Sequence, residues 1–237
     1  MNLPIIRGFN HTSEIGRDVF SPSIFLEGCN LRCPFCMNSR LVTGKANSQI
    51  DIAEVKDFVS QNKSEWLMIG GGEPTCIPLD SLIELLKEIK SWGCKVGIST
   101  NGVNHDVLIN IINYLNYVAL DFKSPSPDCY DEISMVPNSY RNMLMSRSFL
   151  ELTKKFSKDF DYEIRTTLYP PFINQESLRE IGKFINRKDK WFLQQFRHNK
   201  NMMDENCKNI QPYSDEQINK LLSIAKEYCD NVFLRYV

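Results

Sequence analysis

Residues 23–36 read SIFLEGCNLRCPFC, an apolar run followed by three closely spaced cysteines. The run has the length and the branched and aromatic content of a buried strand, so Cys29, Cys33 and Cys36 are expected in the loop that follows it. Thiolates are soft ligands, suited to zinc or to iron–sulfur clusters. The stretch therefore predicts a metal-binding loop at the end of a strand.

Three protein ligands suit an iron–sulfur cube with one corner left for another molecule, because such a cluster normally takes four. A catalytic metal keeps an open position in the same way. The alternative is a structural zinc site whose fourth ligand lies elsewhere, for example Cys76 or His105. The spacing of the cysteines alone leaves both possibilities open.

Short apolar runs alternate with helix-like stretches along the rest of the chain. Strands are predicted at 23–28, 66–71, 95–100, 117–123, 162–169 and 190–196, with a final apolar run at 232–237. Helices are predicted at 51–62, 79–92, 104–113, 143–157, 174–187 and 214–229. This α/β alternation predicts a parallel sheet with helices outside, either an open doubly wound sheet or a partial TIM-like barrel of about six βα units. Residues 1–237 are expected to form a single domain.

Residues at the predicted helix ends indicate where the helices begin and stop. Asp51 and Asp80 are expected N-terminal caps, and Ser214 begins a capping-box pattern. Gly93 stops the second helix where a left-handed residue is favoured. The segment 124–139 is the least regular and is expected to be a loop with one weak helical turn.

Composition restricts the class of protein. The formal net charge is -1, with 24% charged and 42% hydrophobic residues, which indicates a globular fold and gives no bulk electrostatic attraction to nucleic acid or membranes. The N-terminus lacks the pattern of a signal peptide, and no apolar run reaches membrane-spanning length. We expect a cytoplasmic protein whose eight cysteines are ligands or buried residues rather than disulfides.

Four further motifs stand at predicted strand ends: GGGEP at 70–74, STNG at 99–102, DFK at 121–123 and IRTT at 164–167. The carboxyl ends of parallel strands meet at one edge of the sheet, where function is located in both candidate architectures. These motifs and the cysteine loop are therefore expected to face one cavity.

The cysteine motif, with the aromatic Phe35 before its last cysteine, resembles that of the radical S-adenosylmethionine (SAM) enzymes when taken with these four segments. The resemblance covers most of the chain. It implies a 4Fe-4S cluster on Cys29, Cys33 and Cys36, with the amino and carboxylate groups of SAM on the fourth iron. Such enzymes cleave SAM reductively to a 5'-deoxyadenosyl radical, and the protein positions the cofactors and excludes water.

The same resemblance implies contacts to SAM from the first two of these segments, GGGEP and STNG. Gly71 and Gly72 would let the backbone approach the methionine moiety, because glycine has no side chain to collide. Glu73 would bind the ammonium group. Thr100 and Asn101 would hydrogen-bond the ribose or the methionine carboxylate.

Charged residues of the later segments complete the expected site. Lys123 and Arg165 would supply positive charge for the SAM carboxylate. Asp121 is expected on the same face as Lys123 because strand side chains alternate, although a plain ion pair is an equal possibility. Gln195, near the end of a predicted strand, is an expected adenine contact, together with the neighbouring Phe196.

Within the superfamily, the chain resembles the activating enzymes of glycyl-radical proteins, in particular those of anaerobic ribonucleotide reductases. The segments FLEGCNLRCPFCMNSRLV, GGGEP, STNG, YVALDFKS, DYEIRTTLYP, WFLQQFR and a terminal VFLRYV occur in the expected order. The implied partners are a glycyl-radical enzyme and an electron donor such as flavodoxin or ferredoxin. The implied reaction is removal of hydrogen from a glycine of that partner enzyme.

Two positions depart from that pattern. Activators of this kind carry an aspartate before the TNG threonine, which helps to form a monovalent-cation site, whereas this chain has Ser99. A serine hydroxyl is a poorer cation ligand than a carboxylate. Met37 stands where many relatives have histidine, which leaves the cluster ligands unchanged.

Two other functions remain open. One is a radical SAM enzyme that modifies a small molecule, nucleoside or peptide in biosynthesis. The other is a non-catalytic metal-binding scaffold with four protein ligands. The remaining cysteines show no second cluster motif and are expected to be small core residues or bystanders; they are Cys76, Cys94, Cys129, Cys207 and Cys229.

Overall fold

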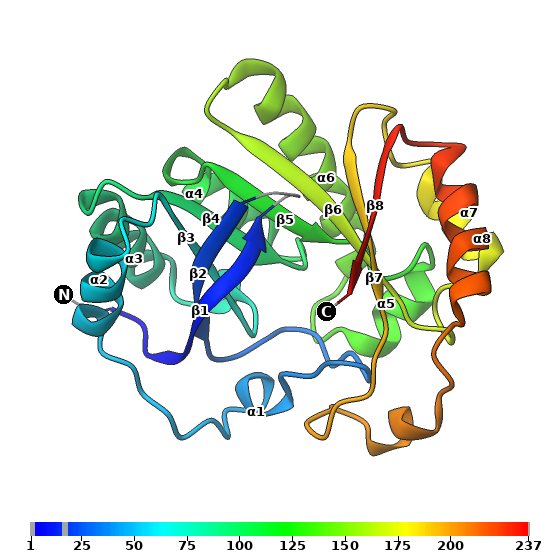
Figure 1. The fold of residues 1–237 in the computed structure, drawn as a ribbon, viewed down its shortest axis with the longest axis horizontal. Helices are drawn as coiled ribbons and strands as arrows, with labels where there is room; N and C mark the ends of the chain where they lie inside the picture. Colours follow the sequence, from blue (N-terminus) through cyan, green and yellow to red (C-terminus); the bar gives the residue numbers. More distant parts are fainter. Residues whose placement is uncertain (1–2, 16–18, 237) are drawn as a thin grey trace.

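The computed structural model describes residues 3–15 and 19–236, which form one eight-stranded sheet in the order β1 to β8 (Figure 1). β1 (Ile6–Ile15) pairs antiparallel with β2 (Val19–Leu26), and all later neighbours pair in parallel. The other strands are β3 (Trp66–Gly71), β4 (Lys95–Thr100), β5 (Tyr117–Asp121), β6 (Asp161–Leu168), β7 (Lys190–Gln195) and β8 (Asn231–Tyr236).

The strand order decides between the two predicted architectures. A doubly wound sheet reverses its strand order at a switch point, whereas here each parallel strand lies beside the next one along the chain. The prediction of a partial TIM-like barrel is therefore confirmed. β1 was not predicted, because its sequence, IRGFNHTSEI, lacks the apolar run of a buried strand and lies at the edge of the sheet.

Helices follow the strands and cover the outside of the sheet (Figure 1). They are α1 (Ser39–Val42), α2 (Ile52–Gln61), α3 (Leu79–Ser91), α4 (His105–Ile111), α5 (Pro127–Ile133), α6 (Ser139–Phe156), α7 (Gln175–Gly182) and α8 (Asp215–Lys226). Short 3-10 turns lie at Pro74–Cys76, Ile112–Tyr114 and Glu205–Asn209. Each predicted helix exists, and the segment expected to be mostly loop contains the seven-residue α5 and the start of α6. None of the described helices is both long and apolar enough to cross a bilayer.

Three of the four expected helix-end residues act as predicted. Asp51 accepts a hydrogen bond from the amide of Ala53, Ser214 forms a capping box with Gln217, and Gly93 has φ +84°. The prediction for Asp80 is wrong. Helix α3 begins one residue before it, at Leu79, so Asp80 lies in the first turn, where a negative charge still suits the helix dipole.

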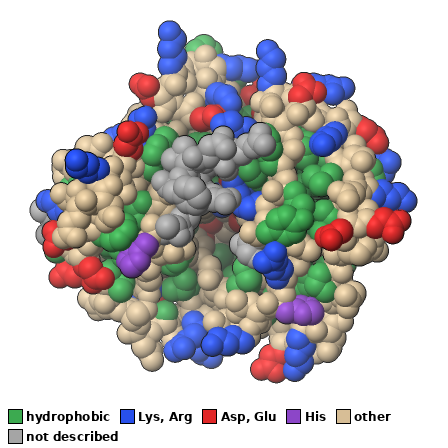
Figure 2. Space-filling view, in the orientation of Figure 1, with side chains coloured by type: hydrophobic (Ala, Val, Ile, Leu, Met, Phe, Trp, Pro, Cys, Tyr) green, Lys and Arg blue, Asp and Glu red, His purple; other side chains and the backbone are tan. Residues whose placement is uncertain are grey.

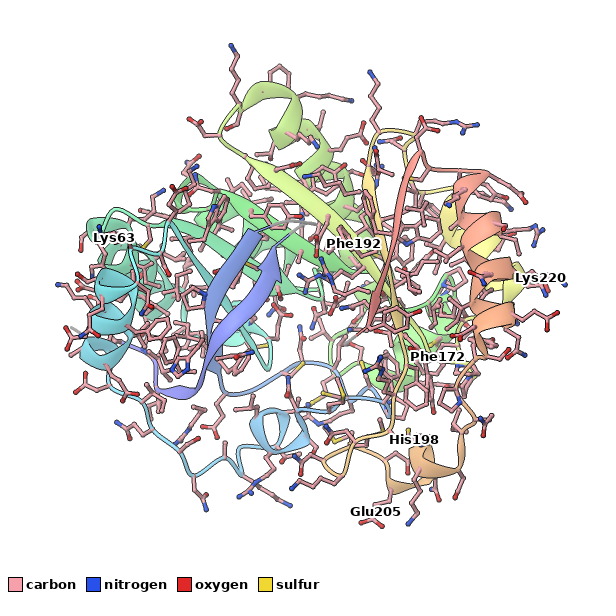
Figure 3. The ribbon with its side chains drawn as sticks, viewed as in Figure 1. Lys63, Phe172, Phe192, His198, Glu205 and Lys220 are labelled. Carbon is pink, nitrogen blue, oxygen red and sulfur yellow. The ribbon has the colours of Figure 1, made fainter. Side chains whose placement is uncertain are left out.

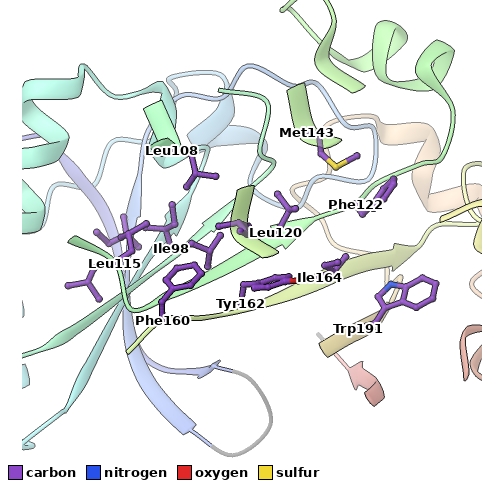
Figure 4. Close-up of a cluster of buried hydrophobic side chains, with 14 of the residues drawn as sticks. Ile98, Leu108, Leu115, Leu120, Phe122, Met143, Phe160, Tyr162, Ile164 and Trp191 are labelled. Carbon is purple, nitrogen blue, oxygen red and sulfur yellow. The ribbon is translucent and has the colours of Figure 1, made fainter. Parts of the chain in front are cut away.

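The two faces of the sheet differ in chemistry. Strand residues such as Ile98, Leu120 and Ile164 are fully buried beneath the helices, where they meet Leu108 and Met143 (Figure 4). Side chains alternate along a strand, so the neighbouring residues point to the opposite, inner face. That inner face carries polar and charged side chains and forms the wall of a cavity.

Candidate active site

A cavity of about 370 Å³ lies at the carboxyl ends of the strands. Figure 2 shows a hollow near the middle of the molecule in the same region. The residues that line the cavity come from all the motifs predicted to meet there. They are Ser23, Phe25, Cys29, Leu31, Cys33, Phe35, Cys36, Asn38, Val42, Met68, Gly70, Gly71, Gly72, Glu73, Ser99, Thr100, Asn101, Asp121, Lys123 and Arg165.

Later parts of the chain hold the cysteine loop against the barrel. The amide of Arg32 donates to the carbonyl of Ile133 at the end of α5, at 2.6 Å. The amide of Met203 donates to the carbonyl of Cys36, at 2.9 Å. Phe35 packs on Tyr169, which follows β6, with ring centroids 4.8 Å apart. Segments far apart in sequence therefore fix the backbone of the loop.

The three thiols are held in a poorly hydrated place. Burial raises the pKa of Cys29 to about 11 and that of Cys33 to about 12, and it also raises the pKa of Cys36. The nearby Lys123 acts in the opposite direction on all three and favours their thiolates. No three Asp, Glu, His or Cys side chains are gathered at metal-ligand positions within the described residues. The identity of the thiols and their shared cavity fit an iron–sulfur cluster that would bring them together.

The zinc alternative named Cys76 and His105 as possible fourth ligands. Cys76 is exposed, does not line the cavity, and accepts a hydrogen bond from the Asn104 side chain at 3.6 Å. The Nδ1 atom of His105 lies 3.2 Å from the hydroxyl of Ser146. Neither residue lines the cavity, although the Cys76 thiol lies close enough to Cys29 and Glu73 for their negative charges to add to the effect of burial in raising its pKa.

Gly71 and Gly72 bring β3 close to the start of the cysteine loop. A Cβ atom on Gly72 would lie 1.9 Å from the carbonyl oxygen of Gly28, and Gly71 has φ +107°. This contact is tight because the amide of Glu73 donates to the same Gly28 oxygen at 2.7 Å. Glycine is required at both positions to connect GGGEP with the cysteine loop.

Glu73 is almost fully buried, and the donors that bind it within residues 3–15 and 19–236 are neutral. Its Oε1 atom accepts from the hydroxyls of Thr75 and Thr100, both at 2.6 Å, and from the Thr75 amide at 3.2 Å. Its Oε2 atom accepts from the amide of Asn101 at 2.7 Å. Burial raises the pKa of Glu73, although these four hydrogen bonds oppose that shift. The carboxylate thus holds GGGEP against STNG at the cavity wall.

Lys123 and Arg165 place positive charge in the cavity. Lys123 Nζ lies 2.9 Å from Asp121 Oδ2 and 5.9 Å from the centre of the Phe35 ring. Arg165 Nη1 donates to the hydroxyl of Ser99 at 3.1 Å, and Asp121 is the register partner of Arg165. Ser99 and Asp121 are the two side chains that would face a monovalent cation. Ser99 already contacts Arg165, and Asp121 already contacts Lys123, so the residues present do not fit that cation site.

Comparison with known proteins identifies the family. Residues 23–186 match the radical SAM superfamily.

The chain belongs to the radical SAM superfamily.

A Methanocaldococcus jannaschii protein with the provisional name glycyl-radical enzyme activating enzyme is 30% identical over 222 residues, which is 92% of this chain and 89% of that protein. The 7-carboxy-7-deazaguanine synthase of Haemophilus influenzae is 28% identical over 201 residues, covering 81% and 90% of the two chains. In structure, a radical SAM methyltransferase from Sphaerobacter thermophilus superposes with a TM-score of 0.62 at 14% identity, over 91% of this chain and 66% of that one.

This radical SAM enzyme is an oxidoreductase that uses a 4Fe-4S cluster and SAM. Cys29, Cys33 and Cys36 would hold the cluster, which would supply one electron for cleavage of the sulfonium. The residues that line the cavity would hold both cofactors and keep water away from them.

The enzyme's cavity also contains residues that the motifs did not indicate. Ser23 and Phe25 of β2 and Met68 of β3 line it, as do Leu31, Asn38 and Val42. The period-two alternation along β2 and β3 was the available signal, because residues two apart share a face. Gln195, by contrast, is not among the lining residues, and its adenine contact stays a prediction.

Proposed function

We propose that this radical SAM enzyme activates a glycyl-radical enzyme, most specifically an anaerobic ribonucleotide reductase, by removing hydrogen from a backbone glycine. The observation that carries the proposal is the meeting of CxxxCxxC, GGGEP, STNG and DFK around one cavity. The similarity to a named activating enzyme along nearly the whole of both chains supports it.

In this proposal, Cys29, Cys33 and Cys36 hold the cluster. Gly71 and Gly72 let the protein backbone approach the methionine moiety of SAM. The negative charge of the Glu73 carboxylate attracts the ammonium group of that moiety. The remaining expected contacts are Phe35, Thr100, Asn101, Asp121, Lys123 and Arg165, all of which line the cavity. We keep Gln195 as the adenine contact.

The proposed reaction balances with one electron from outside. Reductive cleavage of the carbon–sulfur bond gives methionine and a 5'-deoxyadenosyl radical, which takes a hydrogen atom from glycine and leaves 5'-deoxyadenosine and a glycyl radical. Flavodoxin or ferredoxin is the proposed electron donor. We also propose that the enzyme is cytoplasmic. The continuous sheet supports treating residues 1–237 as one domain.

Electron paramagnetic resonance tests the proposal directly. The reconstituted enzyme is reduced anaerobically, mixed with SAM and a candidate reductase, and examined for the doublet of a glycyl radical. A Cys33→Ala variant and a reductase lacking its radical glycine serve as controls and should give no doublet. Cleavage of SAM without a doublet for any glycyl-radical protein of the source organism would contradict the proposal.

A second candidate is modification of a small heterocycle. Its supporting observation is the 28% identity to a 7-carboxy-7-deazaguanine synthase over 90% of that relative. Incubation with the precursor of 7-carboxy-7-deazaguanine and mass spectrometry of the products tests it. Conversion of that precursor in the absence of any protein partner would favour this function over glycine activation.

A further inference from the structure

Five charged side chains with alternating signs cross the inner face of the sheet. We call them the charge row: Arg235, Glu163, Arg165, Asp121 and Lys123. Arg235 Nη1 lies 2.9 Å from Glu163 Oε1, and Arg165 Nε pairs with the same oxygen. At the other end, Lys123 Nζ lies 2.9 Å from Asp121 Oδ2.

Strand geometry creates the row. Glu163 and Arg165 are two residues apart on β6 and share the inner face. Asp121 of β5 is the register partner of Arg165. Burial lowers the pKa of the Arg165 guanidinium, but the negative charges of Glu163 and then Asp121 outweigh that effect and raise it. Arg235 comes from β8, which is two strands away from β6 in the sheet. Its guanidinium lies 4.0 Å from the centre of the Phe192 ring on β7. Figure 3 shows Phe192 near the centre of the molecule.

The row contains three cations and two carboxylates, and therefore one excess positive charge. Glu163 is fully buried, and the Arg235 side chain is 9% exposed, so water screens this pair weakly. Only the far part of the row lines the cavity, namely Arg165, Asp121 and Lys123. Without Arg235, the carboxylates of Glu163 and Asp121 would neutralise Arg165 and Lys123 completely.

The other cavity carboxylate stands apart from the row. Glu73 binds only hydroxyl and amide donors, from Thr75, Thr100 and Asn101. The cavity therefore has a carboxylate on one side and a net positive row on the other. An amino acid moiety carries matching charges, an ammonium group and a carboxylate, at one end.

We propose that Arg235 is a positioning residue for SAM: it lies outside the cavity, neutralises Glu163, and so preserves the positive charge that Lys123 and Arg165 present to the SAM carboxylate. This inference rests on the proposed roles of Lys123 and Arg165. It assigns to the last strand a part in cofactor binding.

A purely structural role for the Arg235–Glu163 pair makes a different prediction. Removal of one partner of a buried ion pair destabilises a protein because the other charge is left uncompensated. Removal of both partners restores the charge of the row, since Arg165, Asp121 and Lys123 again sum to one positive charge. The single variant Glu163→Gln separates charge supply from structural support. It raises the net positive charge of the row and should bind SAM at least as tightly as the wild type, whereas a purely structural role predicts weaker binding, as for Arg235→Met.

The experiment measures the dissociation constant of SAM by equilibrium dialysis. The protein carries its oxidised cluster, so SAM is not consumed, and the iron content of each variant is determined. Arg235→Met keeps the alkyl part over Phe192 and should weaken binding about tenfold, an order-of-magnitude value for one partly screened charge. Arg235→Lys should stay within about threefold of the wild type, because it keeps the charge.

The double variant Glu163→Gln/Arg235→Met should bind SAM about as tightly as the wild type. Arg197→Met is the matched control, because Arg197 is exposed and lies outside the row. Equal binding by Arg235→Met and the wild type, at equal iron content, would overturn the proposal, and so would a double variant as weak as the single one.

Should Arg235→Met lose its cluster, Arg235→Gln makes the same charge change and retains a hydrogen-bond donor. SAM binding requires no protein partner. A missing glycyl radical would therefore count against the proposed function and leave this comparison intact.

Discussion

At the scale of the residue, the site depends on a few positions where only one side chain fits. Gly72 lies against the backbone of Gly28, and Glu73 accepts four hydrogen bonds from neighbouring loops. Cys33 is buried, whereas Cys76, a short distance further along the chain from GGGEP, is exposed. Residue type alone did not distinguish the buried Cys33 from the exposed Cys76, whereas their positions in the fold do.

Cys33→Ala should abolish both cluster assembly and cleavage of SAM, because two thiolates cannot replace three at the cluster. Iron content and 5'-deoxyadenosine measured after anaerobic reconstitution check this expectation. Cys94→Ala is the matched control: Cys94 is also buried, but its thiol donates to the carbonyl of Ser64 at 3.4 Å, away from the cavity. Full activity in Cys33→Ala would exclude the proposed ligand set.

Gly72→Ala should destabilise the fold by about 3 kcal/mol and weaken SAM binding, because the new methyl group would overlap the Gly28 carbonyl. Denaturant unfolding and equilibrium dialysis measure the two effects.

Gly93→Ala provides the comparison for that variant. Gly93, unlike Gly72, has a left-handed backbone, φ +84°, but a Cβ atom there would meet nothing within 4 Å. Gly93→Ala should lower the free energy of unfolding by about 1–2 kcal/mol and leave SAM binding unchanged. The interpretation of GGGEP would be wrong if both alanine variants bound SAM equally well.

At the scale of the element, helix α6 shows how surface charge stabilises one layer of the barrel. Glu151 accepts a hydrogen bond from Lys155, one turn later, at 2.7 Å, and forms an ion pair with Arg147, one turn earlier. Arg147 also binds Asp189 at 2.9 Å, just before β7. Arg147 thus connects α6 to the start of β7. Glu151 and Asp189 bind its guanidinium, and Lys155 in turn binds Glu151.

Glu151→Gln should lower the free energy of unfolding by about 0.5–1 kcal/mol at neutral pH, the size of a solvent-screened ion pair. Hydrogen bonding to Lys155 is the main cause that lowers the pKa of Glu151 from 4.5 to about 2. A carboxylate with a lowered pKa stabilises the fold above its unfolded pKa and loses that effect as the pH falls through its folded pKa. The difference between variant and wild type should therefore shrink between about pH 4.5 and 2.

Urea unfolding at several pH values tests this. A double variant, Glu151→Gln/Lys155→Met, should lose less than the sum of the two single variants, because they remove the same interaction. A pH-independent loss for Glu151→Gln would show that the carboxylate charge is not responsible.

At the scale of the whole molecule, the order of the strands makes the site. Seven parallel strands bring their carboxyl ends to one rim, and the outer helices bury the opposite face. Interior strands have partners on both sides, whereas β1 and β8 each have one partner strand in the described sheet. The cavity therefore lies at the carboxyl ends of strands that are paired on both sides.

Hydrogen exchange should reflect that order. The amides of β4 and β5, which are paired on both sides and mostly buried, should exchange most slowly. Those of β1 and β8 should exchange faster, because an edge strand can separate without breaking two ladders. Mass spectrometry of peptic peptides after exchange in deuterated buffer measures both, and greater protection of β1 than of β5 would contradict the expectation.

The sequence alone determined the alternation of strands and helices, the cysteine loop, and the motifs at the strand ends. These are local features, since apolar period, helix caps and ligand type are encoded over a few neighbouring residues. The sequence also predicted that the motifs would share a cavity, because parallel strands end on one rim. The resemblance carried by CxxxCxxC, GGGEP, STNG and DFK then specified the cofactors.

Only the tertiary structure decided between a doubly wound sheet and a barrel, because strand order depends on long-range pairing that leaves no local signal. It also revealed β1, whose polar edge position gives no buried-strand pattern, and the wall residues Ser23 and Met68. The meeting of Arg235 with Glu163, 72 residues earlier, likewise depends on the register of three strands. Contacts between distant residues are fixed by packing of the whole sheet, and for that reason no short segment could predict them.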